Sequence, residues 1–515
     1  MARSNAIVWA TAAFMTLAYW PAANAQEATK EKVLAALPQL EALARKVVDD
    51  KEAPGLSIGV VFEDEVLYLE GFGVRQVGKT DPVDADTVFQ LASFSKPIAS
   101  TVIAAVVGEG TVSWDSRISD IDPSFRLQDP YASAEVTLRD LFSHRSGLSA
   151  DAGNDLETIG YSRDEILPRL RYLKPTSSFR SAYAYSNFGM TEGGVAAAKA
   201  AGMSWEDLAD AKLYKPLGMT STSSRHADFL THANRAELHV PIDGAWQPVV
   251  KRMPDAQSPA GGVSSNVRDL VNWVRLQLGD GAFDGKQVIG ADALAETHLP
   301  VIMRGKNPMN RQPSFYGLGW GVDFGEHGIV LAHSGAFSAG AETVVSMIPA
   351  EHLGIVVLSN AFPTGVPEGL AATFYDLVFD GRPSQDWIAR WGALFKGAFG
   401  ERVVQEAMAP FAKVPSPPRA ALAPAAYTGA YANDYIGNVE ISEKDGVLVI
   451  ALGPDGSVTF PLKHFDGDTF LVYPLAESPT LPAALHFEIG FDQKAAAVVL
   501  DIFNDNGQGT VTRVP

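Results

Sequence analysis

A serine and a lysine three residues apart are the first residues in this sequence whose types and spacing suit chemistry. Ser93 and Lys96 follow the largely apolar stretch 87–92 and precede the apolar run 98–107. Residues i and i+3 at the start of a helix share one face, so the lysine amine would stand beside the serine hydroxyl. A serine hydroxyl is a weak nucleophile until a neighbouring base takes its proton. The pair therefore predicts a serine that is acylated, with Lys96 handling its proton.

Two further short patterns contain groups that suit the same reaction. Tyr185 and Asn187 put a phenol and a carboxamide on one side of an extended turn. A phenol acts as a base near neutral pH only if adjacent cations lower its pKa from about 10. His333-Ser334-Gly335 ends a predicted strand, where glycine would let a substrate lie against the strand edge. The next amide, that of Ala336, would then point inward as an oxyanion donor.

These three patterns, in this order, resemble the motifs of the serine β-lactamases and penicillin-binding proteins. Within that group the sequence is most similar to class C β-lactamases, D,D-carboxypeptidases, D-aminopeptidases and related esterases. Segments 136–148, 259–263 and 316–320 also resemble the group, and the resemblance covers about residues 35–380. It implies Ser93 as nucleophile, Lys96 and Tyr185 as proton-handling partners, and the amides of Ser93 and Ala336 as oxyanion donors. The substrate-binding residues that it implies are Asn187, His333, Gly335 and Ala336.

The third pattern departs from the members that hydrolyse penicillins, which usually carry lysine where this chain has His333. Histidine there resembles certain D,D-peptidases and D-aminopeptidases. The sequence therefore predicts a serine peptidase, of carboxypeptidase or aminopeptidase type, acting on D-amino-acid-containing or modified peptides. A short-chain esterase or a β-lactamase is the alternative, and a non-catalytic ligand-binding or sensing protein is the second alternative. Because histidine has a reference pKa near 6.5, we expect His333 to bind a substrate carboxylate mainly at lower pH.

Three other matches to the second and third patterns are interpreted as structural. Tyr431-Ala432-Asn433 lies beyond a proline-rich segment, far along the chain from the serine. His352-Leu353-Gly354 falls in a turn between two predicted strands, and Lys444-Asp445-Gly446 reads as a hairpin turn.

The elements that must position these residues follow from the hydrophobic pattern. A helix is predicted over 31–48, and strands over 56–62 and 66–71. The middle of the chain is helix-rich, and from Tyr316 the pattern changes to strands at 318–324, 329–333, 343–348 and 355–360. The spacing of 387–395 predicts a helix that packs on these strands. Together they predict an α+β fold of the β-lactamase and penicillin-binding type, with an antiparallel sheet flanked by helices and a helical subdomain.

The chain is expected to divide into four segments. A signal peptide is predicted for 1–25, because Arg3 precedes a short apolar run and Ala23-Asn24-Ala25 has the small-x-small form of a cleavage site. A catalytic domain would span 26–410 and a proline-rich linker 411–424. Residues 425–515 contain short alternating runs separated by Asp-Gly turns, which predict a small closed β-barrel that resembles a lipocalin-like domain.

Composition narrows the remaining choices. The 515 residues carry a formal net charge of −19, which argues against nucleic acid and anionic membranes as partners. There is no cysteine, so neither a thiol nucleophile nor a lipoprotein anchor is expected, and no histidine pattern predicts a metal site. We expect a periplasmic or secreted protein that needs no cofactor, acts on a small-molecule or peptide substrate, and does not insert in a membrane after cleavage. The sequence leaves the oligomeric state open.

Overall fold

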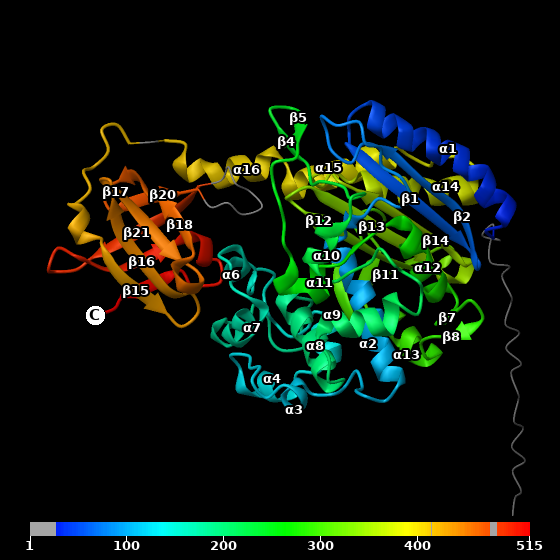
Figure 1. Ribbon diagram of the computed structural model, residues 1–515, viewed down its shortest axis with the longest axis horizontal. Coiled ribbons are helices and arrows are strands. Elements are labelled where there is room, and N and C mark those ends of the chain that lie inside the picture. The colour runs from blue at the N-terminus through cyan, green and yellow to red at the C-terminus, as the bar shows by residue number, and fades with distance from the viewer. Residues whose placement is uncertain (1–26, 414, 474–481) are drawn as a thin grey trace, which may run out of the picture.

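The computed structural model describes residues 27–413, 415–473 and 482–515 (Figure 1). The predicted signal peptide, 1–25, lies outside the described residues. Within those ranges, none of the helices combines the length and the apolar character that crossing a membrane requires.

An eight-stranded antiparallel sheet forms the centre of the larger domain, in the order β2-β1-β14-β13-β12-β11-β10-β9. Its N-terminal strand β1 pairs with β14 in the register Leu56 to Ser359, so strands from both ends of the domain share one sheet, as predicted. The strands are β1 (Gly55–Phe62), β2 (Glu65–Gly73), β9 (Ile302–Lys306), β10 (Pro313–Tyr316), β11 (Gly321–Gly325), β12 (Gly328–Phe337), β13 (Ala341–Ile348) and β14 (Leu353–Ser359).

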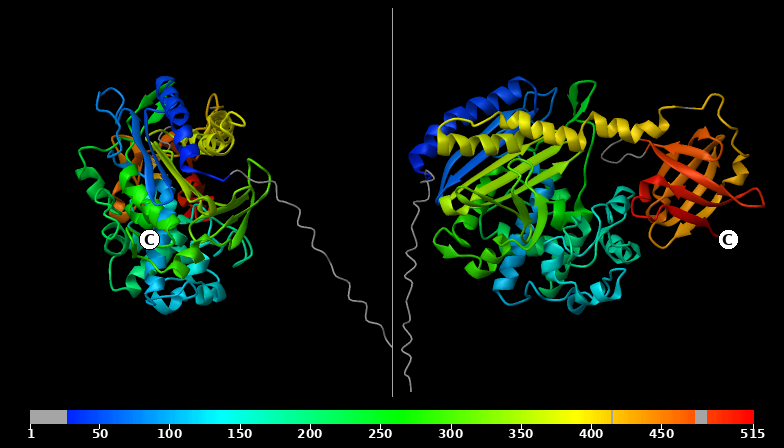
Figure 2. Two further views of the ribbon diagram at one scale, coloured as in Figure 1. Left: turned by 90° about the vertical axis from the view of Figure 1, so that its right-hand side faces the viewer. Right: turned by 180° about the vertical axis from the view of Figure 1, so that it is seen from behind.

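One face of the sheet is covered by α1 (Lys30–Asp49) and α14 (Val366–Asp380), as Figure 2 shows. The helix predicted over 387–395 is present as α15 (Trp387–Phe399), but it packs mainly on α14, which itself packs on β13 and β14. None of the side chains of α15 is fully buried. This helix therefore forms an outer layer, because α14 already occupies the surface of the sheet.

The other face packs against α2 (Ser95–Gly108) and α12 (Val267–Leu278), whose buried side chains belong to the larger apolar core. A helical subdomain lies beside this face (Figure 1). Its helices are α3 (Ile118–Ile121), α4 (Pro130–Glu135), α5 (Leu138–Phe142), α6 (Asn154–Thr158), α7 (Arg163–Ile166), α8 (Asn187–Ala200), α9 (Trp205–Ala209), α10 (His226–Thr231), α11 (Ser258–Gly261) and α13 (Ala291–Ala295). Three two-stranded pairs complete the domain: β3 (Phe89–Gln90) with β6 (Ser264–Ser265), β4 (Val240–Ile242) with β5 (Ala245–Gln247), and β7 (Ala282–Phe283) with β8 (Lys286–Gln287).

The C-terminal domain is a nine-stranded antiparallel barrel, reached through α16 (Glu401–Met408). Residues 412–413 and 415–423, within the predicted linker, contain no helix or strand. The strand order runs from β18 to β19 with no pairing between those two among the described residues, so the barrel is nearly closed rather than closed. The strands are β15 (Gly429–Asn433), β16 (Gly437–Lys444), β17 (Val447–Leu452), β18 (Val458–Pro461), β19 (Lys463–Asp466), β20 (Thr469–Val472), β21 (Ala483–Ile489), β22 (Ala495–Leu500) and β23 (Thr510–Arg513).

The barrel contacts the helical subdomain at the segment around α6 and α7 (Figure 1). The Tyr435 hydroxyl donates to Asp155 Oδ1 at 2.5 Å and accepts the amide proton of Gly153 at 3.2 Å. The Tyr161 hydroxyl donates to the carbonyl of Ile436 at 2.7 Å. Ile159, which is almost fully buried, lines a small apolar cavity formed otherwise by barrel residues. Polar and apolar contacts thus join the two domains at this segment.

Candidate active site

Ser93 lies in the turn that leads into α2, and the first helical turn carries Lys96. Ala92 is buried and has a φ of +49°, a left-handed conformation that is uncommon for a residue with a side chain. Gly335 on β12 lies directly against this turn, because a Cβ there would stand only 2.0 Å from the carbonyl oxygen of Leu91. This glycine therefore lets β12 approach the nucleophile turn. The protein's own packing thus requires glycine here, in addition to the predicted reason, room for a substrate.

Two of the predicted polar groups contact the serine hydroxyl, and the third contacts the lysine. Lys96 Nζ lies 2.9 Å from Ser93 Oγ, and the Tyr185 hydroxyl donates to the same oxygen at 2.7 Å. Lys96 Nζ also donates to Asn187 Oδ1 at 2.8 Å and to the carbonyl of Ala260 at 2.9 Å. The sequence indicated the first three partners but not the Ala260 carbonyl, which comes from α11.

Burial sets the protonation of the two proton-handling groups. Lys96 is completely buried, and its desolvation holds the pKa of the amine well below the usual value for lysine. Desolvation raises the pKa of Tyr185 above its usual value, although the contact with Ser93 partly offsets this effect. The neutral amine and the neutral phenol are therefore both favoured. With two N–H bonds directed at Asn187 Oδ1 and the Ala260 carbonyl, a neutral Lys96 can turn its lone pair to the serine proton.

His333 lies on β12, which continues to Phe337, four residues beyond the predicted end of the strand. Its Nδ1 lies 2.7 Å from the Ser334 carbonyl and its Nε2 lies 2.8 Å from the Tyr316 hydroxyl. A carbonyl only accepts, so Nδ1 carries the proton and Nε2 accepts from the tyrosine. Desolvation and the nearby Lys96 lower the pKa of His333 to about 3. The expectation that this histidine becomes a cation below about pH 6.5 is therefore wrong, because desolvation disfavours the cation and both ring nitrogens are engaged in hydrogen bonds.

A buried histidine, His144, supports the Tyr185 segment. His144 Nδ1 accepts the amide proton of Ser186 at 3.1 Å, and its ring centre lies 4.5 Å from that of Tyr185. Ser186 is also the N-cap of α8, where its hydroxyl accepts the amide proton of Gly189. The start of α8 and the contact between the two rings together fix Tyr185 and Asn187 relative to Ser93.

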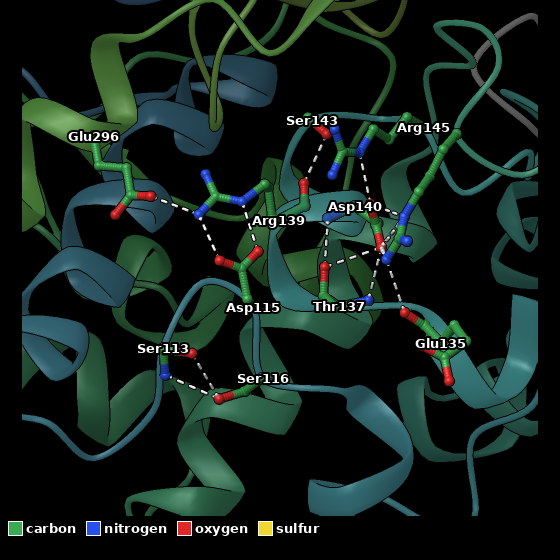
Figure 3. Close-up of polar contacts among 11 residues, drawn as sticks. Ser113, Asp115, Ser116, Glu135, Thr137, Arg139, Asp140, Ser143, Arg145 and Glu296 are labelled. Atoms are coloured by element: carbon green, nitrogen blue, oxygen red, sulfur yellow. Dashed lines mark hydrogen bonds and ion pairs between the residues drawn. The ribbon is translucent and has the colours of Figure 1, made fainter.

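A network of charges centred on Asp140 holds the same region (Figure 3). Asp140, on α5, has a fully buried side chain that bonds Arg145 Nε at 2.6 Å and Arg180 Nη2 at 2.7 Å. Burial opposes ionisation of this carboxyl, but the hydrogen bonds from Arg180 and Arg145 outweigh it and lower the pKa. Arg145 follows His144 in the chain and Arg180 precedes the Tyr185 turn. One carboxylate therefore ties together the two segments that position the tyrosine.

Two cavities adjoin the catalytic groups from different sides. The first, about 480 Å³, is lined by Ser93, Asn187 and Ala336, together with Asn154, Glu157 and Thr158 of the segment that contacts the barrel. The second, about 680 Å³, is lined by Tyr185, His333 and Tyr316. We call these the Asn187 cavity and the Tyr185 cavity. Pairing of β12 with β11 ends at Ala332, so residues 333–337 present a free strand edge. This edge lies between the two cavities.

Other candidate patterns lie away from this site. Tyr431 is buried in the barrel and His352 occupies a tight turn between β13 and β14, as interpreted from the sequence. The stretch Gly55 to Gly59 matches the Gly-x-Ser-x-Gly pattern of lipase nucleophiles. Its Ser57 lies in the middle of β1 with no exposed surface, so a substrate cannot reach it. Among the described residues there is no cluster of histidine and carboxylate side chains suited to a metal ion.

Comparison with known proteins agrees with this geometry. The beta-lactamase family model matches residues 40–378, and the model of a domain of unknown function, DUF3471, matches residues 412–511. The chain belongs to the beta-lactamase family, a fold family of serine hydrolases that act on amide bonds. The resemblance to β-lactamases and penicillin-binding proteins that the motifs indicated is therefore confirmed.

Individual relatives are distant. An unguisins hydrolase of Aspergillus campestris is 25% identical over 414 residues, covering 76% of this chain and 74% of that protein. Penicillin-binding protein 4 of Amycolatopsis lactamdurans is 26% identical over 344 residues, covering 64% of this chain and 85% of its own length. The octameric penicillin-binding protein homologue from Pyrococcus abyssi superposes with a TM-score of 0.56 at 19% identity, covering 93% of this chain and all of that one. This last likeness extends the shared fold to most of the chain.

Proposed function

We propose that the protein is an exported serine peptidase that cleaves amide bonds of D-amino-acid-containing or modified peptides through an acyl-enzyme on Ser93. The single observation that supports this most strongly is the position of Ser93 Oγ, 2.9 Å from Lys96 Nζ and 2.7 Å from the Tyr185 hydroxyl. The relatives named as an unguisins hydrolase and as a penicillin-binding protein support hydrolysis or acylation by amide-like substrates. The signal-like N-terminal sequence supports a periplasmic or secreted location.

The contacts favour Lys96 as the base that activates the nucleophile. Its neutral amine accepts the Ser93 proton as Oγ attacks the substrate carbonyl carbon and the carbonyl π electrons move to oxygen. The amides of Ser93 and Ala336 are the proposed donors to the resulting oxyanion, each worth about 3–4 kcal/mol in comparable sites. The structure offers no support for a free phenolate, since burial raises the pKa of Tyr185.

Tyr185 is the proposed acid for the leaving group. As the tetrahedral intermediate collapses, its hydroxyl proton passes to the departing nitrogen or oxygen, and the lysine ammonium restores the phenol. Lys96 Nζ lies 4.6 Å from the centre of the Tyr185 ring, close enough to stabilise the developing negative charge. Water then attacks the acyl-enzyme by the same proton route. The leaving group therefore belongs in the Tyr185 cavity and the acyl group in the Asn187 cavity.

A substrate panel tests the proposed function. Purified protein is assayed with D-amino-acid amides and D-peptides, short-chain esters and chromogenic β-lactams, with Ser93→Ala beside the wild type. We expect Ser93-dependent turnover that is fastest for the D-configured amides and peptides. Fast turnover of esters alone would instead support a short-chain esterase. Dominant hydrolysis of β-lactams would support a β-lactamase, although a neutral His333 offers their carboxylate no cation. Binding of substrates without turnover would support the non-catalytic alternative.

A further inference from the structure

The Tyr185 cavity extends beyond the catalytic groups to the opposite face of the sheet. At one end it is lined by Tyr185 and His333, and at the other by Glu368 of α14 and Trp391 of α15. Ser334 also lines the cavity and pairs with Val344, whose side chain packs in the core beneath α14. The free edge of β12 thus separates the two ends, and a group bound at Tyr185 can extend past this edge towards α14.

The far end of the cavity contains polar groups whose hydrogen bonding is incomplete. Glu368 is only 4% exposed, and neither of its carboxylate oxygens has a partner within ordinary hydrogen-bond geometry among the described residues, although Ser334 and Glu342 lie near enough to lower its pKa. The Trp391 indole nitrogen, and the Tyr375 hydroxyl near Ser346, likewise have no partner within that geometry, and both residues line the same cavity. Buried polar groups in native proteins are nearly all paired, and each exception calls for an explanation. Three residues that line one cavity carry such groups, and a polar ligand would supply the missing partners.

Two carboxyl groups lie side by side at this end of the cavity. Glu342, on β13, is fully buried beside Glu368, and its carboxylate accepts hydrogen bonds from the amides of Thr364 and Gly365 at 2.8 and 2.6 Å. Burial raises the pKa of Glu368 to about 7, and burial together with the charge of Glu368 raises the pKa of Glu342. Neither carboxylate forms an ion pair within the described part of the chain. The cations that line this cavity, Arg304 and Lys306, are exposed on β9.

Aromatic residues line the same cavity as Glu368. They are Tyr375, Trp387 and Trp391. The faces of such rings attract cations, and a carboxylate that lacks donors takes up N–H groups. A primary ammonium group would satisfy both, because it carries a positive charge and three donors.

We propose that the α14 end of the Tyr185 cavity binds a primary ammonium group on the leaving-group portion of the substrate, with Glu368 as its carboxylate partner. The inference rests on the proposed function, because that function places the leaving group at Tyr185. It adds a charge preference to the specificity of the enzyme: peptides with a lysine-like or amino-bearing group after the scissile bond are the preferred class.

Matched aryl acetates test this preference. The phenyl leaving groups carry an aminomethyl, 2-aminoethyl or 3-aminopropyl group in the para position, and each is paired with the alkyl analogue of equal length. Because every substrate is an acetate, all of them form the same acyl-enzyme and share the same deacylation step. For at least one length, wild type should prefer the ammonium ester in kcat/KM by about tenfold or more. Glu368→Gln should reduce this ratio to about one, while Glu326→Gln, a carboxylate change in the β11–β12 turn outside the cavity, should leave it unchanged. An equal ratio in wild type and Glu368→Gln would overturn the proposal and would leave Glu342 and Glu368 as a structural pair.

Two additional measurements separate the possible failures. If Ser93→Ala hydrolyses these esters as fast as wild type, the proposed function fails, whatever the charge preference. The second measurement follows binding without catalysis, in Ser93→Ala. Benzylamine hydrochloride should raise the melting temperature of this variant, and benzyl alcohol should not. The additional Glu368→Gln change should abolish the shift. If Glu368→Gln does not fold, Trp391→Leu replaces it, since Trp391 is only partly buried. An unchanged ammonium preference in that folded variant would overturn the proposal.

Discussion

Removal of one hydroxyl group tests whether the barrel shapes the acyl side of the active site. Tyr435→Phe deletes the bond to Asp155 Oδ1 at 2.5 Å and leaves the buried Gly153 amide without its partner at 3.2 Å. The Asn154, Glu157 and Thr158 side chains of this segment line the Asn187 cavity. We therefore expect the substitution to loosen one wall of the acyl site without touching Ser93 or Lys96.

The size of the effect follows from the two lost contacts. A hydrogen bond to a charged group contributes about 1.5–3 kcal/mol, and an unpaired buried donor costs about 1–3 kcal/mol. The lower limits of these two ranges add to about 2.5 kcal/mol. If half of that sum, about 1.3 kcal/mol, is lost from binding of the acyl group, kcat/KM falls about tenfold. The loss should occur for substrates with a large acyl group and should be nearly absent for acetyl esters, which do not reach the wall.

The chain offers a matched control inside the barrel. The Tyr427 hydroxyl donates to Asp468 Oδ1 at 2.6 Å and accepts the amide proton of Leu422 at 2.8 Å, the same arrangement without a catalytic-domain partner. Tyr427→Phe should therefore lower the melting temperature as Tyr435→Phe does, but leave the ratio of large-acyl to acetyl kcat/KM unchanged. If the ratio changes equally in both variants, or changes in neither, the docked barrel does not shape the site.

Three other predictions follow from the same contacts. Lys96→Met should lower kcat/KM about 10²- to 10⁴-fold, and the wild-type rate should rise with pH through a pKa below that of free lysine; a profile that shows no such step would argue against Lys96 as the base. Asp140→Asn should cost about 3–5 kcal/mol of unfolding free energy at pH 7, because it leaves two arginines without their buried partner. Since the folded pKa of Asp140 is lowered, its contribution is present above about pH 4, the unfolded value, and is lost as pH falls through the folded pKa. Chemical denaturation should therefore show that the difference in unfolding free energy between wild type and Asp140→Asn is smaller at pH 3 than at pH 7. A difference that is the same at both pH values would contradict the charge argument. Limited proteolysis should cut within 411–424, and resistance of that segment would count against separable domains.

The sequence was sufficient for the parts of the site that depend on local spacing. The i, i+3 relation of Ser93 and Lys96 needs only a helix start, and α2 begins there. The Tyr185 motif was likewise recognisable, because its residues are neighbours in the chain. The hydrophobic patterns also placed six of the eight strands of the central sheet nearly where they lie, helped by wholly buried strands such as β1 and β13, but they did not predict β9, which has no buried residue, or β10.

Long-range contacts explain what the sequence did not indicate. The Ala260 carbonyl reaches Lys96 across 164 positions, and no local pattern marks a carbonyl group as a functional partner. The chemistry of His333 depends on Tyr316, 17 residues earlier, which occupies the nitrogen that would otherwise take a proton. Glu368 becomes notable only because the fold buries it without a partner.

Covalent labelling of the nucleophile tests the central claim most directly. The protein is incubated with a fluorophosphonate or a slowly hydrolysed β-lactam, digested, and mapped by peptide mass spectrometry, with Ser93→Ala treated in parallel. The account predicts one adduct, on Ser93, its absence from the variant, and loss of turnover in a variant that retains the wild-type circular dichroism spectrum. An adduct on another serine, or full activity in Ser93→Ala, would contradict it.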